Sequence, residues 1–234
     1  MEKSMFSAWG IGSFDEHFAG LPKGVFNLLQ VCNNETIIAS MGHFIQEGIR
    51  QDERIVLVGF ENPALLAKNF EKYNFFFDKA LLSEQLIYLY YKPTFSYSLS
   101  FTIDYRDLLK EIRLLANDGV SRVGFLNVDA LFNLQSYLLA RSSAEKVIAS
   151  LVDQDILSLG CYQSTDTQEH HNLRTISNIL VSSYLEIQPG QTAGYPYDLV
   201  WKNCPVVQDL KTIPLALHTG YGFNYLDLRI QKHG

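Results

Sequence analysis

The stretch RIVLVGF, at residues 54–60, is the part of the sequence that decides the fold. It is short and apolar, which is typical of a strand that is buried on both faces of a sheet. Pro63 then stands where proline suits the first turn of a helix, and apolar residues recur with helical spacing as far as Tyr73. The segment therefore predicts a buried strand followed by a helix, which is the repeating unit of an α/β fold.

The same alternation continues in both directions along the chain. Upstream, VFNLLQV at residues 25–31 predicts a buried strand, and the apolar spacing over residues 37–50 predicts a helix. Alternating strands and helices indicate βαβ units and a parallel sheet. The further predicted elements are strands at residues 86–90, 122–128, 159–163, 179–187, 199–203 and 213–217, and helices at residues 105–117 and 131–156.

The fold class predicted from these elements is α/β, with a mostly parallel central sheet flanked by helices. The shorter strands from residue 179 onward predict antiparallel strands added at the C-terminal edge of the sheet. The chain contains no linker, charge block or internal repeat that would divide it. We therefore expect residues 1–234 to form a single domain.

The composition limits the classes of function. Hydrophobic residues make up 47% of the chain and charged residues 19%, which excludes disorder. The formal net charge of −6 predicts no general attraction to nucleic acid or to anionic lipid. The three cysteines, Cys32, Cys161 and Cys204, form no CxxC pair. The N-terminus has no apolar signal core. We therefore expect a cytoplasmic protein that does not contact a membrane.

Several strings, taken in order, resemble the RecA-like ATPase core and in particular its KaiC-like branch. The resemblance covers nearly the whole chain and places SRVGFLNVDAL, residues 121–131, at the Walker B strand. The other strings that carry it are GIGSFDEHFAGLPKGVFNLL (residues 10–29), FIQEG (44–48), RIVLVGFENPALL (54–66), VWKNCPVVQDL (200–210) and TIPLALHTGYGFNYL (212–226).

The resemblance implies a phosphate-binding loop of the form G-x-x-x-x-G-K-[ST], and it places that loop at VCNNETII, residues 31–38. Val31 and Thr36 replace the two glycines. Ile37 replaces the lysine that would reach the phosphates, and Ile38 replaces the hydroxyl that would hold Mg²⁺. Glu35 adds a negative charge where a triphosphate would lie. The residues of this degenerate loop are Asn33, Asn34, Glu35, Thr36, Ile37 and Ile38.

The second nucleotide motif also departs from the pattern of the family. Leu126 stands at the position of the Walker B aspartate, and Asn127 beside it carries no charge. The acidic pair that follows the second strand is reduced to Glu61 and Asn62. Phosphoryl transfer depends on neutralising the charge of the phosphates, so we expect no enzymatic activity, no cofactor and no metal.

The resemblance then implies a regulatory or scaffolding protein that acts through contacts with a protein partner or with itself, and not with nucleic acid. One alternative is a Mg²⁺-independent sensor of a nucleotide or small molecule, with its cleft lined by Asn33, Asn34, Thr36, Glu61 and Asn127. Another alternative is an active ATPase with displaced residues, such as Lys23.

Two other groups of residues, one with histidines and one with aromatic residues, contain side chains that occur in binding sites. Glu169, His170 and His171 could hold a metal, but a solvated loop is the simpler interpretation of that polar stretch. Aromatic residues are dense at 88–101, with three more at 75–77, and Lys92 is the single basic residue within 88–101. This pattern favours core packing and a protein interface over binding of single-stranded nucleic acid.

Overall fold

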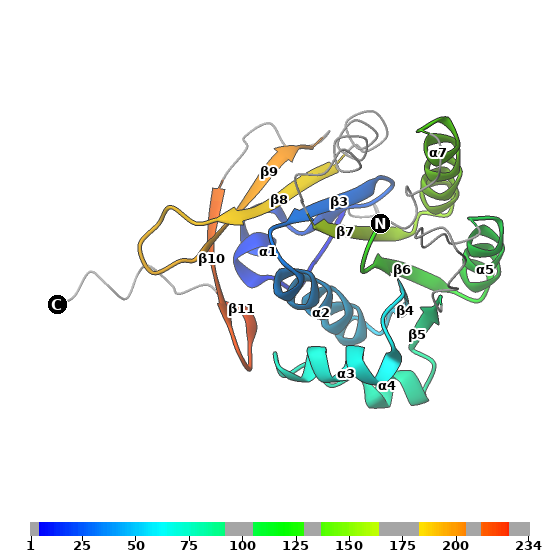
Figure 1. Cartoon of the computed structure of the whole chain (residues 1–234). Coiled ribbons are helices and arrows are strands. Elements are labelled where there is room, and N and C mark those ends of the chain that lie inside the picture. The colour runs from blue at the N-terminus through cyan, green and yellow to red at the C-terminus, as the bar shows by residue number, and fades with distance from the viewer. Residues whose placement is uncertain (1–4, 92–104, 129–136, 164–182, 205–211, 225–234) are drawn as a thin grey trace, which may run out of the picture.

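The computed structural model describes residues 5–91, 105–128, 137–163, 183–204 and 212–224. Among these residues, nine strands form one sheet (Figure 1). Their spatial order is β11 (Gly222–Asn224), β10 (Thr212–His218), β9 (Tyr197–Asn203), β8 (Ser183–Pro189), β3 (Phe26–Val31), β7 (Leu157–Gln163), β6 (Val120–Phe125), β4 (Arg54–Gly59) and β5 (Leu86–Tyr90). A separate antiparallel pair is formed by β1 (Phe6–Ser7) and β2 (Leu21–Pro22).

The sheet has a parallel and an antiparallel part. All neighbouring strands from β8 to β5 run parallel, whereas β8, β9, β10 and β11 pair antiparallel in sequence order. The parallel strands lie between two layers of helices, and accordingly every residue of β4 after Arg54 is buried. The predicted fold class, α/β with antiparallel strands at the C-terminal edge, is confirmed.

Helices cover both faces of the sheet (Figure 1). One face carries α1 (Gly12–Phe18), α2 (Asn34–Arg50), α3 (Pro63–Glu71) and α4 (Asp78–Leu82), and the other carries α5 (Tyr105–Asn117) and α7 (Tyr137–Asp153). The chain steps outward from β3 to β4 to β5 and then returns to β6 and β7. Since crossovers between parallel strands are right-handed, the two directions place their helices on opposite faces. We call these faces the α2 layer and the α5–α7 layer.

Alternate residues of the central strands belong to different cores, as the pleat of a strand requires. Ile55 and Leu57 of β4 point to the cluster that includes α2, whereas Val56 and Val58 point to the cluster that includes α5 and α7. A run of four consecutive apolar residues thus contributes to two separate cores. Because both faces of β4 are buried, its apolar residues follow one another without a polar residue between them.

Some predicted boundaries were wrong. The helix α2 begins at Asn34 and not at Ile37, because the side chain of Asn33 caps it. Strand β6 covers Val120–Phe125 and stops short of residue 128. The short elements α1, α4, β1, β2 and β11 were not predicted. Residues 131–136 and 179–182, which belong to a predicted helix and a predicted strand, lie outside the described residues.

The helix α2 is the most enclosed of the helices in the described chain, with all residues from Thr36 to Ile45 buried. The N-terminal segment closes over it, and the indole Nε1 of Trp9 donates to the Ser40 carbonyl at 3.1 Å. On another side the Phe75 ring lies against Gly42, where a Cβ atom would stand 2.3 Å from it. A glycine therefore permits this close approach.

Candidate functional site

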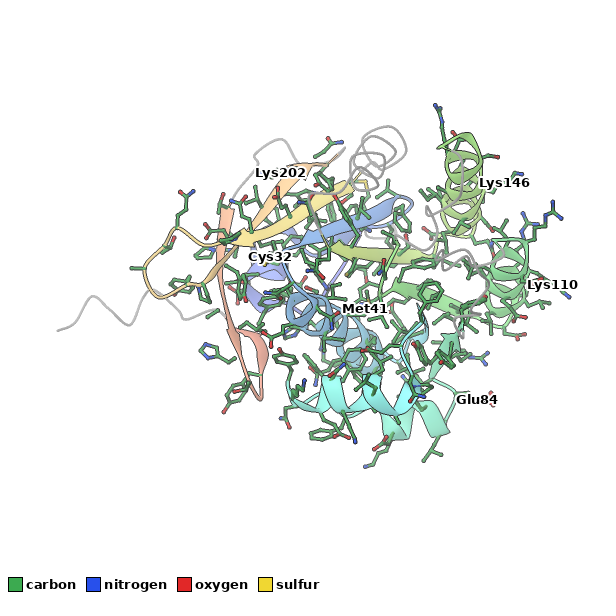
Figure 2. All side chains as sticks on the ribbon, in the orientation of Figure 1. Cys32, Met41, Glu84, Lys110, Lys146 and Lys202 are labelled. Atoms are coloured by element: carbon green, nitrogen blue, oxygen red, sulfur yellow. The ribbon has the colours of Figure 1, made fainter. Side chains whose placement is uncertain are left out.

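The first candidate site is the turn between β3 and α2, where the resemblance placed a phosphate loop. Only Cys32 and Asn33 separate the strand from the helix (Figure 2 labels Cys32). The Asn33 Oδ1 accepts the Thr36 amide at 2.9 Å, and the Thr36 hydroxyl donates to the Asn33 carbonyl at 2.7 Å. The Asn33 Nδ2 donates to the Tyr197 hydroxyl at 3.2 Å. The turn is therefore short, and a hydrogen bond joins it to β9. The side chain of Asn33 caps the helix by accepting from an amide of its first turn.

The residues that replace the phosphate-binding lysine and the Mg²⁺-binding hydroxyl lie inside the protein. Ile37 and Ile38 are buried in the α2 layer, and Thr36 is fully buried. Asn34 and Glu35 are exposed on the first turn of the helix. A carboxylate there interacts favourably with the positive end of the helix dipole. Capping accounts for Asn33, and core packing accounts for Thr36, Ile37 and Ile38.

Glu61 lies just beyond β4, at the same edge of the sheet. Its Oε1 accepts from the Asn69 Nδ2 at 3.0 Å, and its carbonyl accepts from the Tyr88 hydroxyl at 2.7 Å. Burial raises the pKa of the Glu61 carboxyl, and the hydrogen bond from Asn69 opposes that shift. Burial also raises the pKa of the Tyr88 phenol. Glu61 therefore joins α3 to β5 and is held in place by both.

Asn62 has a role that sequence reasoning missed. Its Oδ1 accepts the Ala64 amide at 3.0 Å, and Pro63 occupies the first turn of α3. The pair Asn-Pro at this point was a usable signal, since asparagine is a preferred cap and proline suits the position that follows. Asn33 could have been found in the same way.

The residues at the end of β6 do not form an acidic site. Leu126 is buried, and its amide donates to the Val58 carbonyl at 3.0 Å, which continues the pairing with β4. Asn127 is exposed. Asp129, the next acidic residue, lies outside the described residues. The Leu126 side chain therefore packs in the protein interior, at the position where the pattern of the family has a metal-binding carboxylate.

The histidine pair and part of the aromatic cluster cannot be placed, because residues 164–182 and 92–104 lie outside the described residues. Within the described ranges, no group of three or more His, Cys, Asp or Glu side chains is arranged to hold a metal. Cys32, Cys161 and Cys204 are free thiols. Across the helices described here, none has the length and apolar character needed to cross a membrane.

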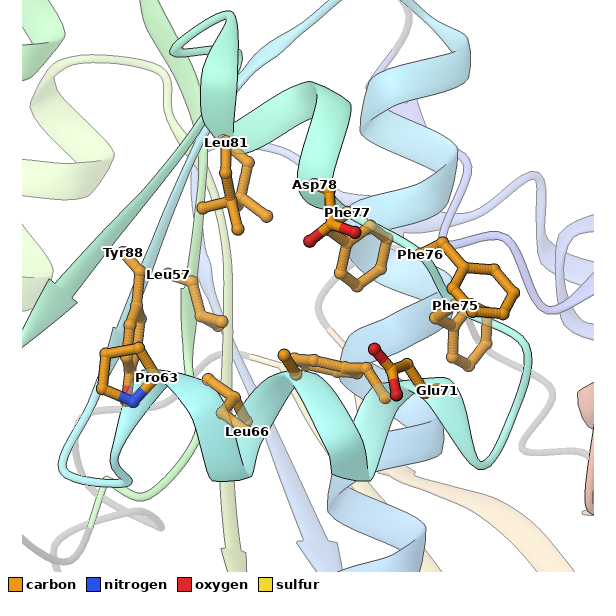
Figure 3. A pocket seen from close by; sticks show the side chains of 13 residues that line it. Leu57, Pro63, Leu66, Glu71, Phe75, Phe76, Phe77, Asp78, Leu81 and Tyr88 are labelled. Atoms are coloured by element: carbon orange, nitrogen blue, oxygen red, sulfur yellow. The ribbon is translucent and has the colours of Figure 1, made fainter.

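The second candidate site is an apolar pocket between α3 and α4 (Figure 3). Its cavity volume is about 80 Å³, and the carboxylates of Glu71 and Asp78 stand at its border. The side chains that line it are Leu57, Pro63, Leu66, Ala67, Phe70, Glu71, Phe75, Phe76, Phe77, Asp78, Leu81, Leu86 and Tyr88.

The elements around this pocket expose large apolar side chains. Phe75 and Phe77 are buried, but Phe76 between them is 64% exposed. Leu82, at the end of α4, is 87% exposed, and Leu65 of α3 is 51% exposed. We call Leu65, Phe76, Leu81 and Leu82, with the pocket beside them, the α3–α4 patch. Phe76 and Leu81 line the pocket, and Leu65 and Leu82 adjoin its lining residues Leu66 and Leu81 in the chain. Exposed apolar groups at a cavity are typical of a protein or ligand contact.

The comparisons with known proteins assign no family to the chain. No family model matches the sequence, and no curated protein matches it significantly. The function is therefore inferred from the residues and the geometry described above.

Proposed function

We propose that the chain is a catalytically inactive RecA/KaiC-like module of the cytoplasm that regulates or scaffolds through protein–protein contacts, either with a partner or with itself. The observation that carries the proposal is the α3–α4 patch. Leu82 at the end of α4 and Phe76 in the segment before α4 are large apolar side chains that are exposed to water. Burying such side chains contributes roughly 1.5–3 kcal/mol each, which gives a partner a reason to bind there.

The proposed lack of catalysis is supported by the first candidate site. Hydrolysis of a nucleotide would need a cation and a Mg²⁺ ligand at the β3–α2 turn. In this chain Ile37 and Ile38 occupy those places and face the core. The Asn33 side chain holds the Thr36 amide, which would otherwise be available to a phosphate. The geometry therefore favours a role in binding over a role in phosphoryl transfer.

A paired substitution tests the binding role. Leu82→Asp removes an exposed apolar side chain from the patch, and Met5→Asp makes a similar change just before β1, where Met5 is 64% exposed. The measurements are the mass in solution over a range of concentrations and quantitative affinity purification. We expect Leu82→Asp to lose self-association or a partner and Met5→Asp to keep it. Identical behaviour of both variants and the wild type would reject the patch as the contact.

Nucleotides test the other half of the proposal. In thermal unfolding with Mg·ATP, ADP, GTP and cyclic dinucleotides, we expect no stabilisation by any of them. A true ligand at a hundredfold excess over its Kd would stabilise the protein by about 2.7 kcal/mol. Stabilisation without Mg²⁺ would establish the sensor alternative, and Mg²⁺-dependent turnover that Lys23→Ala abolishes would establish the ATPase alternative.

A further inference from the structure

A second surface lies on the opposite side of the sheet, in the groove between α5 and α7. The two helices contact each other side by side, and Figure 2 labels Lys110 on one and Lys146 on the other. The groove has a volume of about 940 Å³. Its lining residues are Arg106, Leu109, Lys110, Arg113, Leu114, Asn117, Lys146, Ala149, Ser150, Asp153 and Gln154.

The lining of the groove is strongly basic for a protein with a formal net charge of −6. Arg106, Lys110 and Arg113 follow one another at helical spacing, so they form one stripe along α5. Lys146 adds a cation from α7, and among the described residues of the lining Asp153 alone is acidic. Neither Lys110 nor Arg113 makes an ion pair with a described residue. Lys110 and Arg113 therefore present positive charge that no described carboxylate pairs with.

The acidic residues of α5 lie on another side of the helix. Asp107 and Glu111 do not line the groove, and both act on Tyr91, just beyond β5. Burial, with these two carboxylates adding to it, raises the pKa of the Tyr91 phenol to about 12. Basic and acidic side chains are thus separated onto different stripes of α5. This separation concentrates the attraction for anions in the groove.

The remaining lining residues decide which anion fits. Leu109, Leu114 and Ala149 give the groove an apolar component, and Leu114 is the most exposed large apolar residue of α5. Single-stranded nucleic acid is held by aromatic side chains that stack on the bases, but the described residues of this lining include no aromatic side chain. An amphipathic helix instead places its apolar stripe on such a surface and its charged residues on the flanks. Carboxylates one turn apart on that helix would match the spacing of the cations on α5.

We propose that the α5–α7 groove binds an acidic amphipathic helix of a partner protein. This inference rests on the proposed function, because it gives the chemistry of one partner of a scaffolding module. The partner helix lies between α5 and α7, with its carboxylates against Lys110 and Arg113 and its apolar side chains against Leu109 and Leu114. The α3–α4 patch stays free for a second contact on the opposite face of the sheet (Figure 1).

The test uses the full chain and a fluorescent synthetic helix of about 18 residues, long enough to span the groove. The peptide carries leucines along one face and glutamates on both flanks, and binding is followed by anisotropy. We expect Lys110→Glu with Arg113→Glu to weaken binding at least about tenfold. The matched control, Lys68→Glu with Lys79→Glu, makes the same charge change on α3 and α4 and should leave the affinity within about twofold. Equal losses in both double variants would overturn the proposal.

Changes in the probe separate the possible ligands. Replacing the leucines of the peptide with glutamine should also weaken binding, because a purely electrostatic contact would not require them. A thymidine oligonucleotide and phosphatidylserine vesicles serve as competitors. Binding of either one that depends on Lys110 and Arg113, without binding of the peptide, would assign the groove to phosphate ligands and refute the proposal.

Two measurements keep the result independent of folding and of the proposed function. Thermal unfolding monitored by circular dichroism should be unchanged in the double variants, because all four substituted side chains are exposed. Lys110→Gln with Arg113→Gln should weaken binding by an intermediate amount. Unchanged association of the Leu82→Asp variant would reject the α3–α4 patch. Peptide binding that does not depend on Lys110 and Arg113 would reject the groove alone.

Discussion

The two helical layers are attached to the sheet in different ways. The α2 layer is held by polar groups inside the protein. Arg122 of β6 is fully buried there, and its guanidinium donates to Glu53 at 2.6 Å and to the carbonyls of Phe44 at 2.9 Å and Ala8 at 3.2 Å. The guanidinium also lies over the Phe44 ring, 4.7 Å from its centroid. One side chain thus joins β6, α2 and the N-terminal segment.

The α5–α7 layer rests on apolar contacts instead. Leu108 and Ile112 of α5 and Val147 and Leu151 of α7 are buried against the sheet. Ser150 is a buried polar residue of α7, and its hydroxyl accepts a hydrogen bond from the Gln154 Nε2 of the same helix at 3.0 Å. Apolar contacts are non-directional, whereas buried polar groups require particular partners. We infer that the α2 layer sets the geometry of the fold and that the α5–α7 layer tolerates variation at its surface.

The largest expected effect comes from removing Arg122. Arg122→Met leaves the Glu53 carboxylate and the backbone carbonyls of Phe44 and Ala8 without their donor, and losing one partner of a buried pair costs about 3–5 kcal/mol. We expect the free energy of unfolding in urea to fall by that amount. Arg113→Met, on the exposed side of α5, should change it by less than about 0.5 kcal/mol. Similar values for the two variants would remove the contrast between the layers.

A smaller effect is expected from pH, through His43 of α2. Burial lowers the pKa of His43 to about 4 from 6.5, although backbone hydrogen bonds with Gly10 and Phe223 oppose the shift. The neutral Nε2 accepts the Phe223 amide at 2.9 Å. Above pH 6.5 neither the folded nor the unfolded state carries the proton, so this contribution to stability is complete. As the pH falls toward 4, the unfolded state binds the proton first and the folded state loses stability.

The His43 contribution should amount to about 2 kcal/mol between pH 7 and pH 5. The measurement is the free energy of unfolding in urea across that range for the wild type, His43→Gln and His17→Gln. His17 is exposed on α1, so its variant should keep the wild-type slope. His43→Gln should flatten the slope whatever its absolute stability. An unchanged slope in that variant would show that His43 is not the group responsible.

The smallest expected effect is at the start of α2. Asn33→Ala removes the cap on the Thr36 amide and the bond to Tyr197, and loss of a helix cap costs about 1 kcal/mol. Asn34→Ala, at the next and exposed position, is the matched control and should be nearly neutral. The comparison is made by urea unfolding. A neutral Asn33→Ala would mean that the turn is held by packing and not by its cap.

The sequence supported accurate predictions where the structure is regular. The central strands β3 and β4 were found because parallel strands buried on both faces are continuous apolar runs. The helix α5 was found because its apolar residues recur with helical spacing. In contrast, β1 and β2 are very short, so they carry no periodic signal.

The candidate sites show a different limit. The prediction of a loop over residues 31–38 followed from the resemblance. The helix was expected to begin at Ile37 because that is the first apolar residue of the helical pattern, although Asn33 was a visible cap. No pattern in the sequence indicated that Arg122 would be buried, because its partners Glu53, Phe44 and Ala8 lie far from it in the chain. The pocket between α3 and α4 likewise needs side chains from four elements and the segment between them.

By itself the sequence determined the order and type of the main elements, because apolar spacing and caps act over a few neighbouring residues. Only the tertiary structure decided that β3 lies between β7 and β8, and that β5 ends the sheet. It also decided that Phe76 is exposed between two buried phenylalanines and that the cations of α5 and α7 meet in one groove. These features depend on contacts between distant segments, and such contacts are set by the direction of the crossovers and by packing across the sheet.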